Sequence, residues 1–251
     1  MQKIARVRTR SGYTLPQQPA AEALISAPDS LYALPEPTAL LRSELALVPL
    51  LAAARPAGHA LLLQACATHQ DWSVDTRHLR LSRLHVDGDG LRGDLSCRAD
   101  ALPFEDAAFQ LVVVQHAADA LPAAPDHLAE LARVLAPGGT LQWFGFNRWS
   151  PWLVWLHWRA RGGLEAPTTS GADALRRRLS ALGLSVGRAR MFGSCWPSLT
   201  DADGVIKPLR AAWALTACKQ QSVLTPLRPQ RKRVRIAARP SLAVPSRRNA
   251  G

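Results

Sequence analysis

Phe109-Gln-Leu-Val-Val-Val-Gln-His116 is a short apolar run, rich in β-branched residues, near the middle of the 251-residue chain. Such a run predicts a strand buried on both faces, as in a parallel sheet. From Pro125 onward the apolar residues follow helical spacing at Leu128, Leu131, Ala132 and Leu135. Pro137-Gly138-Gly139 then ends this helix, and residues 140–146 predict a second strand. The order strand, helix, strand is the building unit of an α/β sheet.

Weaker signals extend this unit in both directions. Apolar runs predict strands at residues 60–66, 84–86, 91–97, 184–192 and 211–218. Helical periodicity predicts helices at residues 36–54, with a kink at Pro49, and at residues 151–161 and 171–182. The sequence therefore indicates one α/β domain.

Charge is distributed unevenly along the chain, whose formal net charge is +12. Residues 1–20 carry four basic residues and residues 219–251 carry nine, without a single acidic residue in either segment. Residues 21–150 are acidic on balance, with fifteen acidic and nine basic residues. We predict a disordered basic N-terminal tail at residues 1–27, an α/β domain at residues 28–218 and a basic C-terminal tail from residue 219. The tails are either simply solvated or in contact with RNA, DNA or anionic lipid.

The cysteines and the apolar segments bear on location. Cys66, Cys97, Cys195 and Cys218 show no paired spacing, so neither a zinc site nor a disulfide framework is indicated. No apolar segment reaches the roughly 20 residues that a bilayer-spanning helix needs. We expect a cytoplasmic protein of bacterial type without a transmembrane segment.

Three segments together resemble a known family: Leu102-Pro103-Phe104, the run Phe109–His116, and Leu131-Ala-Arg-Val-Leu-Ala-Pro-Gly-Gly139. They look like the second half of the class I S-adenosylmethionine-dependent methyltransferase domain, in the type 11 group. The resemblance covers residues 60–146. It implies a Rossmann-like, doubly wound, mostly parallel sheet with the last two strands antiparallel at one edge. It also implies S-adenosylmethionine as the methyl donor, bound at the carboxyl ends of the first strands.

The donor-binding loop of this family corresponds here to Gln64-Ala-Cys-Ala-Thr-His69, which contains no glycine. The resemblance makes Gln64, Ala65 and Ala67 the candidate donor contacts. Close approach to a ligand favours residues without a Cβ atom, and any of these positions with a positive φ would be strained.

Acidic residues follow the second predicted strand in Asp87-Gly-Asp-Gly90. A carboxylate there can accept hydrogen bonds from both ribose hydroxyls, so Asp87 is the candidate, with Asp89 in reserve. The same four residues are also typical of an ordinary turn. The resemblance adds three candidates that would border the adenine: Asp100, Ala101 and Leu102.

His116 lies at the end of the central predicted strand, where α/β proteins bind ligands. It is the candidate catalytic residue and a candidate donor contact, because an imidazole can orient a substrate or relay a proton. The alternative is a structural histidine that only forms hydrogen bonds.

The predicted helix that begins after Ser150 is apolar almost all round, with tryptophans at positions 149, 152, 155 and 158. We expect it to pack over the cleft or against another subunit, and the alternative is an interfacial membrane helix. The stretch Asn147-Arg-Trp-Ser-Pro-Trp152 also resembles a signature of a bacterial subgroup of type 11 proteins.

Two functions stay open. One is methyl transfer from S-adenosylmethionine to an unknown acceptor, which depends mainly on positioning and needs no conspicuous catalytic side chain. The other is a catalytically silent scaffold that binds nucleic acid or a protein partner through its basic tails. A nicotinamide dehydrogenase is disfavoured, because its glycine fingerprint is missing.

Overall fold

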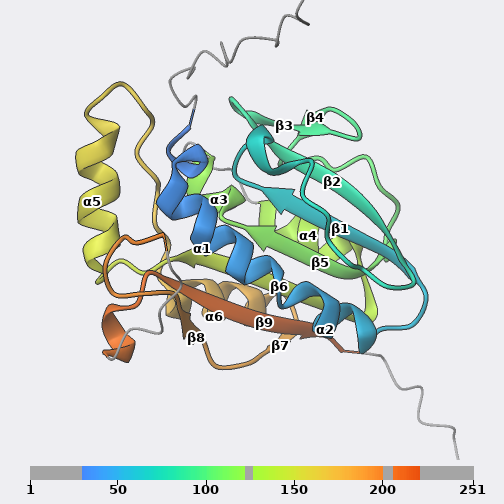
Figure 1. Ribbon diagram of the computed structural model, residues 1–251. Helices are drawn as coiled ribbons and strands as arrows, with labels where there is room; N and C mark the ends of the chain where they lie inside the picture. Colours follow the sequence, from blue (N-terminus) through green and yellow to red (C-terminus); the bar gives the residue numbers. More distant parts are fainter. Residues whose placement is uncertain (1–29, 122–126, 200–205, 221–251) are drawn as a thin grey trace, which may run out of the picture. The chain divides into compact units, whose positions relative to one another are not determined.

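The computed structural model describes residues 30–121, 127–199 and 206–220, all within one compact unit, Met1–Gln221. These residues build one mixed sheet with the strand order β4-β3-β2-β1-β5-β6-β9-β7, and β8 pairs with β9 (Figure 1). The predicted tails lie outside the described residues, apart from Lys219 and Gln220.

The centre of the sheet consists of four parallel strands: β2 (Leu79–Asp87), β1 (Gly58–Gln64), β5 (Phe109–Gln115) and β6 (Leu135–Phe146). Strand β5 has the bounds that its apolar run predicts, and it is buried over nearly its whole length. Helices cover both faces of a parallel sheet, which is why the sequence of this central strand shows no polar alternation.

Antiparallel strands flank this centre on both sides. Strands β3 (Gly90–Gly93) and β4 (Cys97–Arg98) continue the sheet beyond β2. At the other end β9 (Ala212–Lys219) pairs antiparallel with β6 and also with β7 (Leu184–Val186) and β8 (Arg190–Phe192). The α/β fold and the antiparallel edge are therefore confirmed.

Two predicted strands are each divided in the structure. Instead of one strand at residues 91–97 there is a hairpin, since only Gly88 and Asp89 separate β2 from β3. Two residues make a tight turn, with Gly88 at a φ of +58°, and leave no room for a crossover helix. The predicted strand at residues 184–192 is likewise split into β7 and β8.

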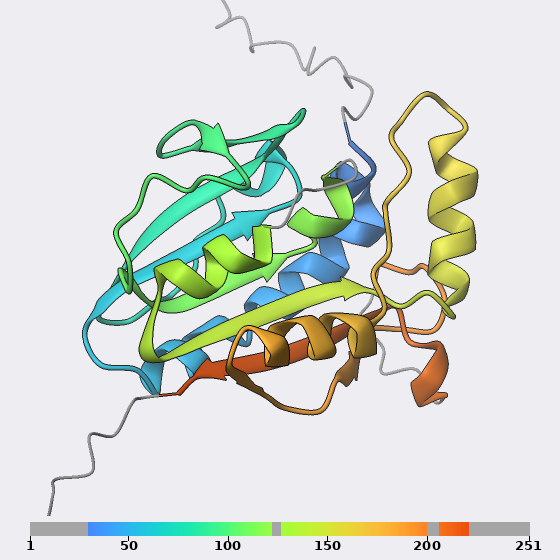
Figure 2. The same ribbon diagram turned by 180° about the vertical axis from the view of Figure 1, so that it is seen from behind.

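Helices cover both faces of the sheet (Figures 1 and 2). Helices α1 (Pro35–Leu45) and α2 (Val48–Ala53) lie on one face, and α4 (His127–Val134) and α6 (Ala172–Ala181) lie on the other. The predicted helix at residues 36–54 is thus broken, and Pro49 falls in the first turn of α2, where a proline needs no N–H partner.

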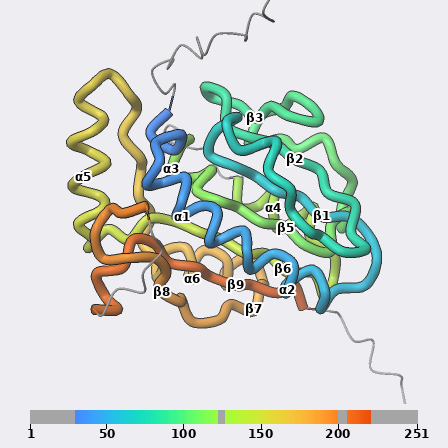
Figure 3. The backbone as a smooth tube through the Cα atoms, viewed as in Figure 1, coloured from blue at the N-terminus to red at the C-terminus, as the bar shows by residue number. Residues whose placement is uncertain are grey.

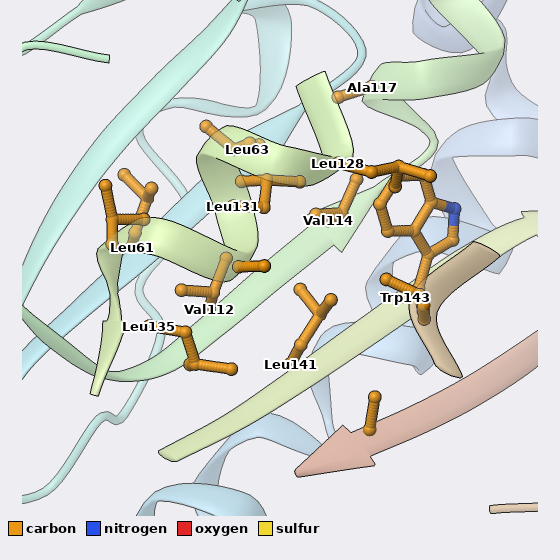
Figure 4. Packing of buried hydrophobic residues seen from close by; sticks show 14 of the residues in the cluster. Leu61, Leu63, Val112, Val114, Ala117, Leu128, Leu131, Leu135, Leu141 and Trp143 are labelled. Carbon is orange, nitrogen blue, oxygen red and sulfur yellow. The ribbon is translucent and has the colours of Figure 1, made fainter. Parts of the chain in front are cut away.

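The core on the α4 face is formed by apolar side chains of β1, β5 and β6 (Figure 4). Leu128 and Leu131 of α4 lie over Val112 and Val114 of β5, as the helical spacing of the sequence predicts. This packing fixes where the strands end, and the arrowheads of β1 and β5 in Figure 1 point toward the short helix α3 (Ala117–Ala120) and toward α5 (Pro151–Ala160).

The connection from β1 to β2 contains no crossover helix (Figure 3). It holds one 3₁₀ turn, η2 (Ala67–His69), followed by an irregular segment up to Leu79. Among the helices of the described ranges, none has both the length and the hydropathy for crossing a membrane.

Candidate functional site

A cavity of about 450 Å³ lies at the carboxyl ends of β1 and β2. Five segments line it: the chain before α1, the η2 loop, the end of β2 with its turn to β3, helix α3 and the loop after α5. Its polar lining includes Tyr32, Cys66, Thr68, His85, Asp87, Asp119 and Glu165. Ligand pockets typically measure roughly 300–1,000 Å³, so the space suits a ligand of nucleoside size.

The η2 loop takes ordinary backbone conformations although it has no glycine. None of residues 64–69 has a positive φ, and Cys66 is extended at a φ of −154°. Ala65 and Ala67 line the cavity and contribute only methyl groups to it. The strain expected from the absent glycines therefore does not arise.

His69, the last residue of η2, turns into the protein. Its Nε2 atom lies 3.3 Å from Thr38 Oγ1, and its ring lies against that of Trp72, with 4.1 Å between the centroids. Burial, together with the nearby Arg42, lowers the pKa of His69 to about 4, so the ring is neutral at pH 7. The His69 side chain therefore does not line the cavity and leaves it open.

Asp87 lies at the end of β2 and lines the cavity. Its Oδ2 atom is 2.8 Å from Nε of Arg92 in an exposed ion pair. Asp87 also pairs with Gly90 across the hairpin turn, so the interpretation of Asp87-Gly-Asp-Gly90 as a turn is confirmed. Asp89, the reserve candidate, does not line the cavity.

Besides Asp89, five candidates from the sequence do not line this cavity: Gln64, Asp100, Ala101, Leu102 and His116. Gln64 is fully buried, and its side-chain amide has no hydrogen-bond partner within the described part of the chain. Asp100 accepts two hydrogen bonds from the guanidinium of Arg98, at 2.8 and 2.7 Å, which hold it on the β4 side of the sheet. Ala101 directly follows Asp100 and is exposed to solvent.

Leu102 is held by α4. Its backbone N–H donates to Oε2 of Glu130 at 3.1 Å, and its carbonyl accepts from Nη2 of Arg133 at 2.9 Å. Arg133 also donates to the carbonyl of Phe104 at 2.9 Å. The backbone groups expected to border the adenine are therefore already satisfied by two charged side chains.

His116 is fully buried and also does not line the cavity. Its Nδ1–H donates to Oδ2 of Asp119 at 2.9 Å, and its Nε2–H donates to Oε1 of Glu44 at 3.0 Å. Because both ring nitrogens are engaged, the ring has no free atom for a substrate. The structure places the predicted catalytic histidine beneath the cavity, as a support of Asp119, which does line it.

This buried cluster carries charge. Burial alone would lower the pKa of His116, but the carboxylates of Glu44 and Asp119 outweigh it and raise that pKa to about 10. The imidazole is consequently a cation at pH 7. Oδ2 of Asp119 also accepts the backbone N–H of Phe146 at 3.0 Å, which ties the ends of β5 and β6 together.

Tyr32 comes from the turn before α1 and lines the same cavity. Its hydroxyl is buried and has no hydrogen-bond partner within the described ranges. Burial, and then the nearby Asp119, raises the pKa of Tyr32, so the hydroxyl keeps its proton. An unsatisfied buried donor beside a cavity is available to a ligand.

Sequence reasoning missed Tyr32, Asp119 and Glu165 as lining residues. Asp119 carries a signal, because it follows His116 by three positions at the start of a helix. Tyr32 and Glu165 lie in loops outside the resemblance, and neither carries a sequence signal of its own.

The residues fit a sulfonium nucleoside on four grounds. The alanines of the η2 loop leave the space next to β1 open, and Asp87 supplies a carboxylate at the end of β2. Asp119 and Glu165 add negative charge to a lining in which the described residues include no lysine or arginine, which suits a cationic ligand. Tyr32 adds an unused hydroxyl.

Comparison with known proteins identifies the domain that contains part of this cavity. Residues 57–142 match the sequence model described as "Methyltransferase domain", of type 11. No curated protein matches the chain.

One solved structure shares the fold, and two others are similar at lower scores. A SAM-dependent methyltransferase from Thermotoga maritima is 14% identical, with a TM-score of 0.50 over 75% of this chain and 93% of that one. A methyltransferase candidate from Bacillus halodurans C-125 is 16% identical, with a TM-score of 0.48, 72% coverage of this chain and 100% of that one. An S-adenosylmethionine-dependent methyltransferase from Mesorhizobium loti is 12% identical, with a TM-score of 0.41, 76% coverage of this chain and 100% of that one.

The walls of the cavity at β1 and β2 belong to the matched segment, which includes both Ala65 and Asp87. S-Adenosylmethionine is the cofactor that goes with this match. Residues 57–142 therefore match the type 11 methyltransferase domain, and the fold is one that the S-adenosylmethionine-dependent methyltransferase from Thermotoga maritima shares.

Proposed function

We propose that this protein binds S-adenosylmethionine in the cavity beside η2 and transfers its methyl group to an acceptor of unknown identity. The observation that carries the proposal is the open, unstrained cavity next to Ala65 and Ala67, in a segment that matches the methyltransferase domain. When bound, the donor supplies an electrophilic methyl group. Such transfer relies on holding the reactants in line, so the protein's task is mainly positioning.

Individual residues take distinct parts in this positioning. Asp87 would accept hydrogen bonds from ribose hydroxyls. Asp119, held by His116 and by the N–H of Phe146, presents a fixed carboxylate to the cavity. The Tyr32 hydroxyl stays protonated and can donate one hydrogen bond. His116 is a positioning residue in this scheme, and the remaining sequence candidates stay predictions.

Calorimetric titration with S-adenosylmethionine and S-adenosylhomocysteine tests the proposal. We expect saturable binding to the wild-type chain and at least about tenfold weaker binding to the variant Ala67→Leu, which fills an exposed part of the cavity wall. Ala53→Leu is the matched control, because Ala53 is an exposed alanine on α2 outside the cavity. No heat from either ligand at millimolar concentration would refute the enzymatic function.

A silent scaffold is not favoured, because its main argument was that the absent glycines had destroyed the donor loop, and that loop is unstrained. The basic end segments still suggest contact with a polyanion, either nucleic acid or an anionic surface. Their charge distribution is the sole support, and most of both segments lies outside the described residues. Nucleic-acid binding that weakens steeply with salt would support that contact.

Location and domain limits are proposals too. All four cysteines are free thiols, which suits a reducing compartment, so we place the protein in the cytoplasm of a bacterial cell. We keep the catalytic domain at residues 28–218, flanked by the two basic segments.

A further inference from the structure

Exposed apolar side chains are concentrated in one region of the described chain. Eight large hydrophobic residues are exposed in the described part of the chain, and six of them come from α5, from its preceding turn, from residues 196–199 or from Ile206. Three are tryptophans: Trp149 is 71% exposed, Trp158 is 59% exposed and Trp196 is 66% exposed. Tryptophan usually buries most of its surface, so three exposed tryptophans in one region indicate a contact surface.

These side chains form one groove. Trp149, Trp158 and Trp196 line a single open cavity of about 550 Å³, together with Val154 and Trp155. A second open cavity continues along α5 past Val154 and Trp158 to His157 and Arg161. We call this combined surface the tryptophan face.

Helix α5 is firmly attached, so the exposure of this face does not come from a loosely docked helix. Its inner residues Trp152 and Leu156 are each 1% exposed, and Nε1 of Trp152 donates to the carbonyl of Ser194 at 3.1 Å. Ser150 caps the helix, and its hydroxyl donates to the carbonyl of Leu209 at 2.9 Å.

The Asn147 side chain completes this attachment. Its Nδ2 atom donates to the carbonyls of Pro208 and Arg210 at 2.7 and 2.9 Å, and its Oδ1 atom accepts the N–H of Trp149 at 3.1 Å. The Asn-Arg-Trp-Ser-Pro-Trp stretch therefore fixes the orientation of α5. One face of the helix packs on the protein and the opposite face is presented outward.

The rim of the tryptophan face is positively charged. Arg148 stacks on Trp149, with Cζ 4.9 Å from the ring centroid, and Arg159 stacks on Trp155 at 5.6 Å. Arg161 lines the far end of the groove. No acidic residue lines either cavity in the described part of the chain.

We propose that the tryptophan face docks on an anionic phospholipid surface. Tryptophan rings prefer the interfacial zone of a bilayer, and arginine rims attract anionic headgroups, so this combination on one helix face matches a peripheral membrane contact. Only the outward face of α5 is available for insertion, so the protein would enter the bilayer only to a shallow depth. The contact is independent of the donor cavity, whose lining shares no residue with the groove.

Vesicle flotation with the full chain tests this docking. The probe is vesicles of phosphatidylcholine and phosphatidylglycerol in a three-to-one ratio, with pure phosphatidylcholine as the comparison. Brominated lipids report insertion, because they quench tryptophan fluorescence only at close range. We expect binding to the anionic vesicles with quenching, and at least about tenfold weaker partitioning of the Trp158→Ala/Trp196→Ala double variant.

Two further variants separate the contributions. Arg159→Gln/Arg161→Gln should weaken binding to anionic vesicles and leave quenching of the bound fraction unchanged. Leu50→Ala is the matched control, because Leu50 is 71% exposed but lies on α2, outside the tryptophan face. Unchanged thermal unfolding of the tryptophan variant confirms that it is folded.

Three outcomes would overturn the proposal. The first is no binding to anionic vesicles. The second is binding that is unchanged in the tryptophan variant and shows no quenching, since basic end segments alone would then account for it. The third is a stable dimer in sedimentation that requires Trp158, which would assign the tryptophan face to a second copy of the chain.

Discussion

The Nε2 atom of His116 lies 3.0 Å from Oε1 of Glu44, which comes 72 positions earlier in the chain. This contact joins the end of the central strand to helix α1. On its other side the same imidazole holds Asp119, so α1 supports one wall of the cavity through a single ring.

Removing a charge from this cluster should destabilise the fold. Glu44→Gln leaves the buried His116 cation with one carboxylate, and breaking a buried ion pair costs about 3–5 kcal/mol. We expect a loss of that size in urea unfolding. Glu105→Gln, a change at an exposed position, should alter the free energy of unfolding by less than about 0.5 kcal/mol. Equal small losses for both variants would show that the Glu44 contact is unimportant.

Stability should fall as the pH rises from neutral to alkaline. His116 has a pKa of about 10 in the folded protein, against about 6.5 when unfolded. A pKa raised by folding gives stability that is complete below about pH 6.5 and is lost as the pH approaches 10. Burial also raises the pKa of Asp119, which acts in the same direction at lower pH.

Urea unfolding at several pH values between roughly 6.5 and 9.5 measures this loss of stability. His116→Gln should be less stable than wild type and should lose most of the slope in this window. A slope that persists in His116→Gln would assign the pH dependence to another group.

The ion pair of Asp87 offers a separate test of the donor site. Arg92 and Asp87 are both well exposed, so Arg92→Gln should change stability by no more than about 1 kcal/mol. It should not weaken donor binding, because it frees a carboxylate oxygen. Asp87→Asn should weaken binding by about tenfold, as one charge-assisted hydrogen bond is lost. Calorimetry that gives equal affinity for Asp87→Asn and wild type would rule out the ribose role.

Arg133 should control the order of the segment after β4. Its guanidinium donates to the carbonyls of Leu102 and Phe104 and to the carboxylate of Glu130. Arg133→Ala should lower the urea midpoint of unfolding and speed amide hydrogen exchange at residues 102–107. Arg176→Ala, which removes an exposed pair with Asp173, is the control and should cost under about 0.5 kcal/mol. Unchanged exchange in Arg133→Ala would contradict this role.

Local patterns predicted the parts of the fold that depend on burial. The bounds of β5, the apolar residues Leu128 and Leu131 of α4 and the helix start after Ser150 were all evident, since each follows from periodicity or capping chemistry. The end of α4 was predicted wrongly, because Leu135 is the first residue of β6 and not part of the helix. The hairpin from β2 to β3 was evident only as an alternative. The residues Asp-Gly-Asp-Gly suit both a turn and a ligand-binding loop; the structure shows the turn, and the ribose contact of Asp87 stays a prediction.

The site was harder to predict because it depends on contacts between distant segments. His116 is held by Glu44, which has no sequence relationship to it, and Asp100 is engaged by the neighbouring Arg98. The conformation of residues 64–69 could not be inferred either. Absent glycines suggest strain only if the backbone needs a positive φ, and here it does not.

The support that Glu44 gives to His116 limits how far the protein can be shortened. A fragment reduced to the matched residues 57–142 would keep the imidazolium and Asp119 but lose α1, and with it the carboxylate that faces the ring. It would also lose the N–H of Phe146 that holds Asp119. We therefore expect the smallest autonomous folding unit to start before Pro35 and to extend at least through β6, so that the matched segment is one component of a larger cooperative body.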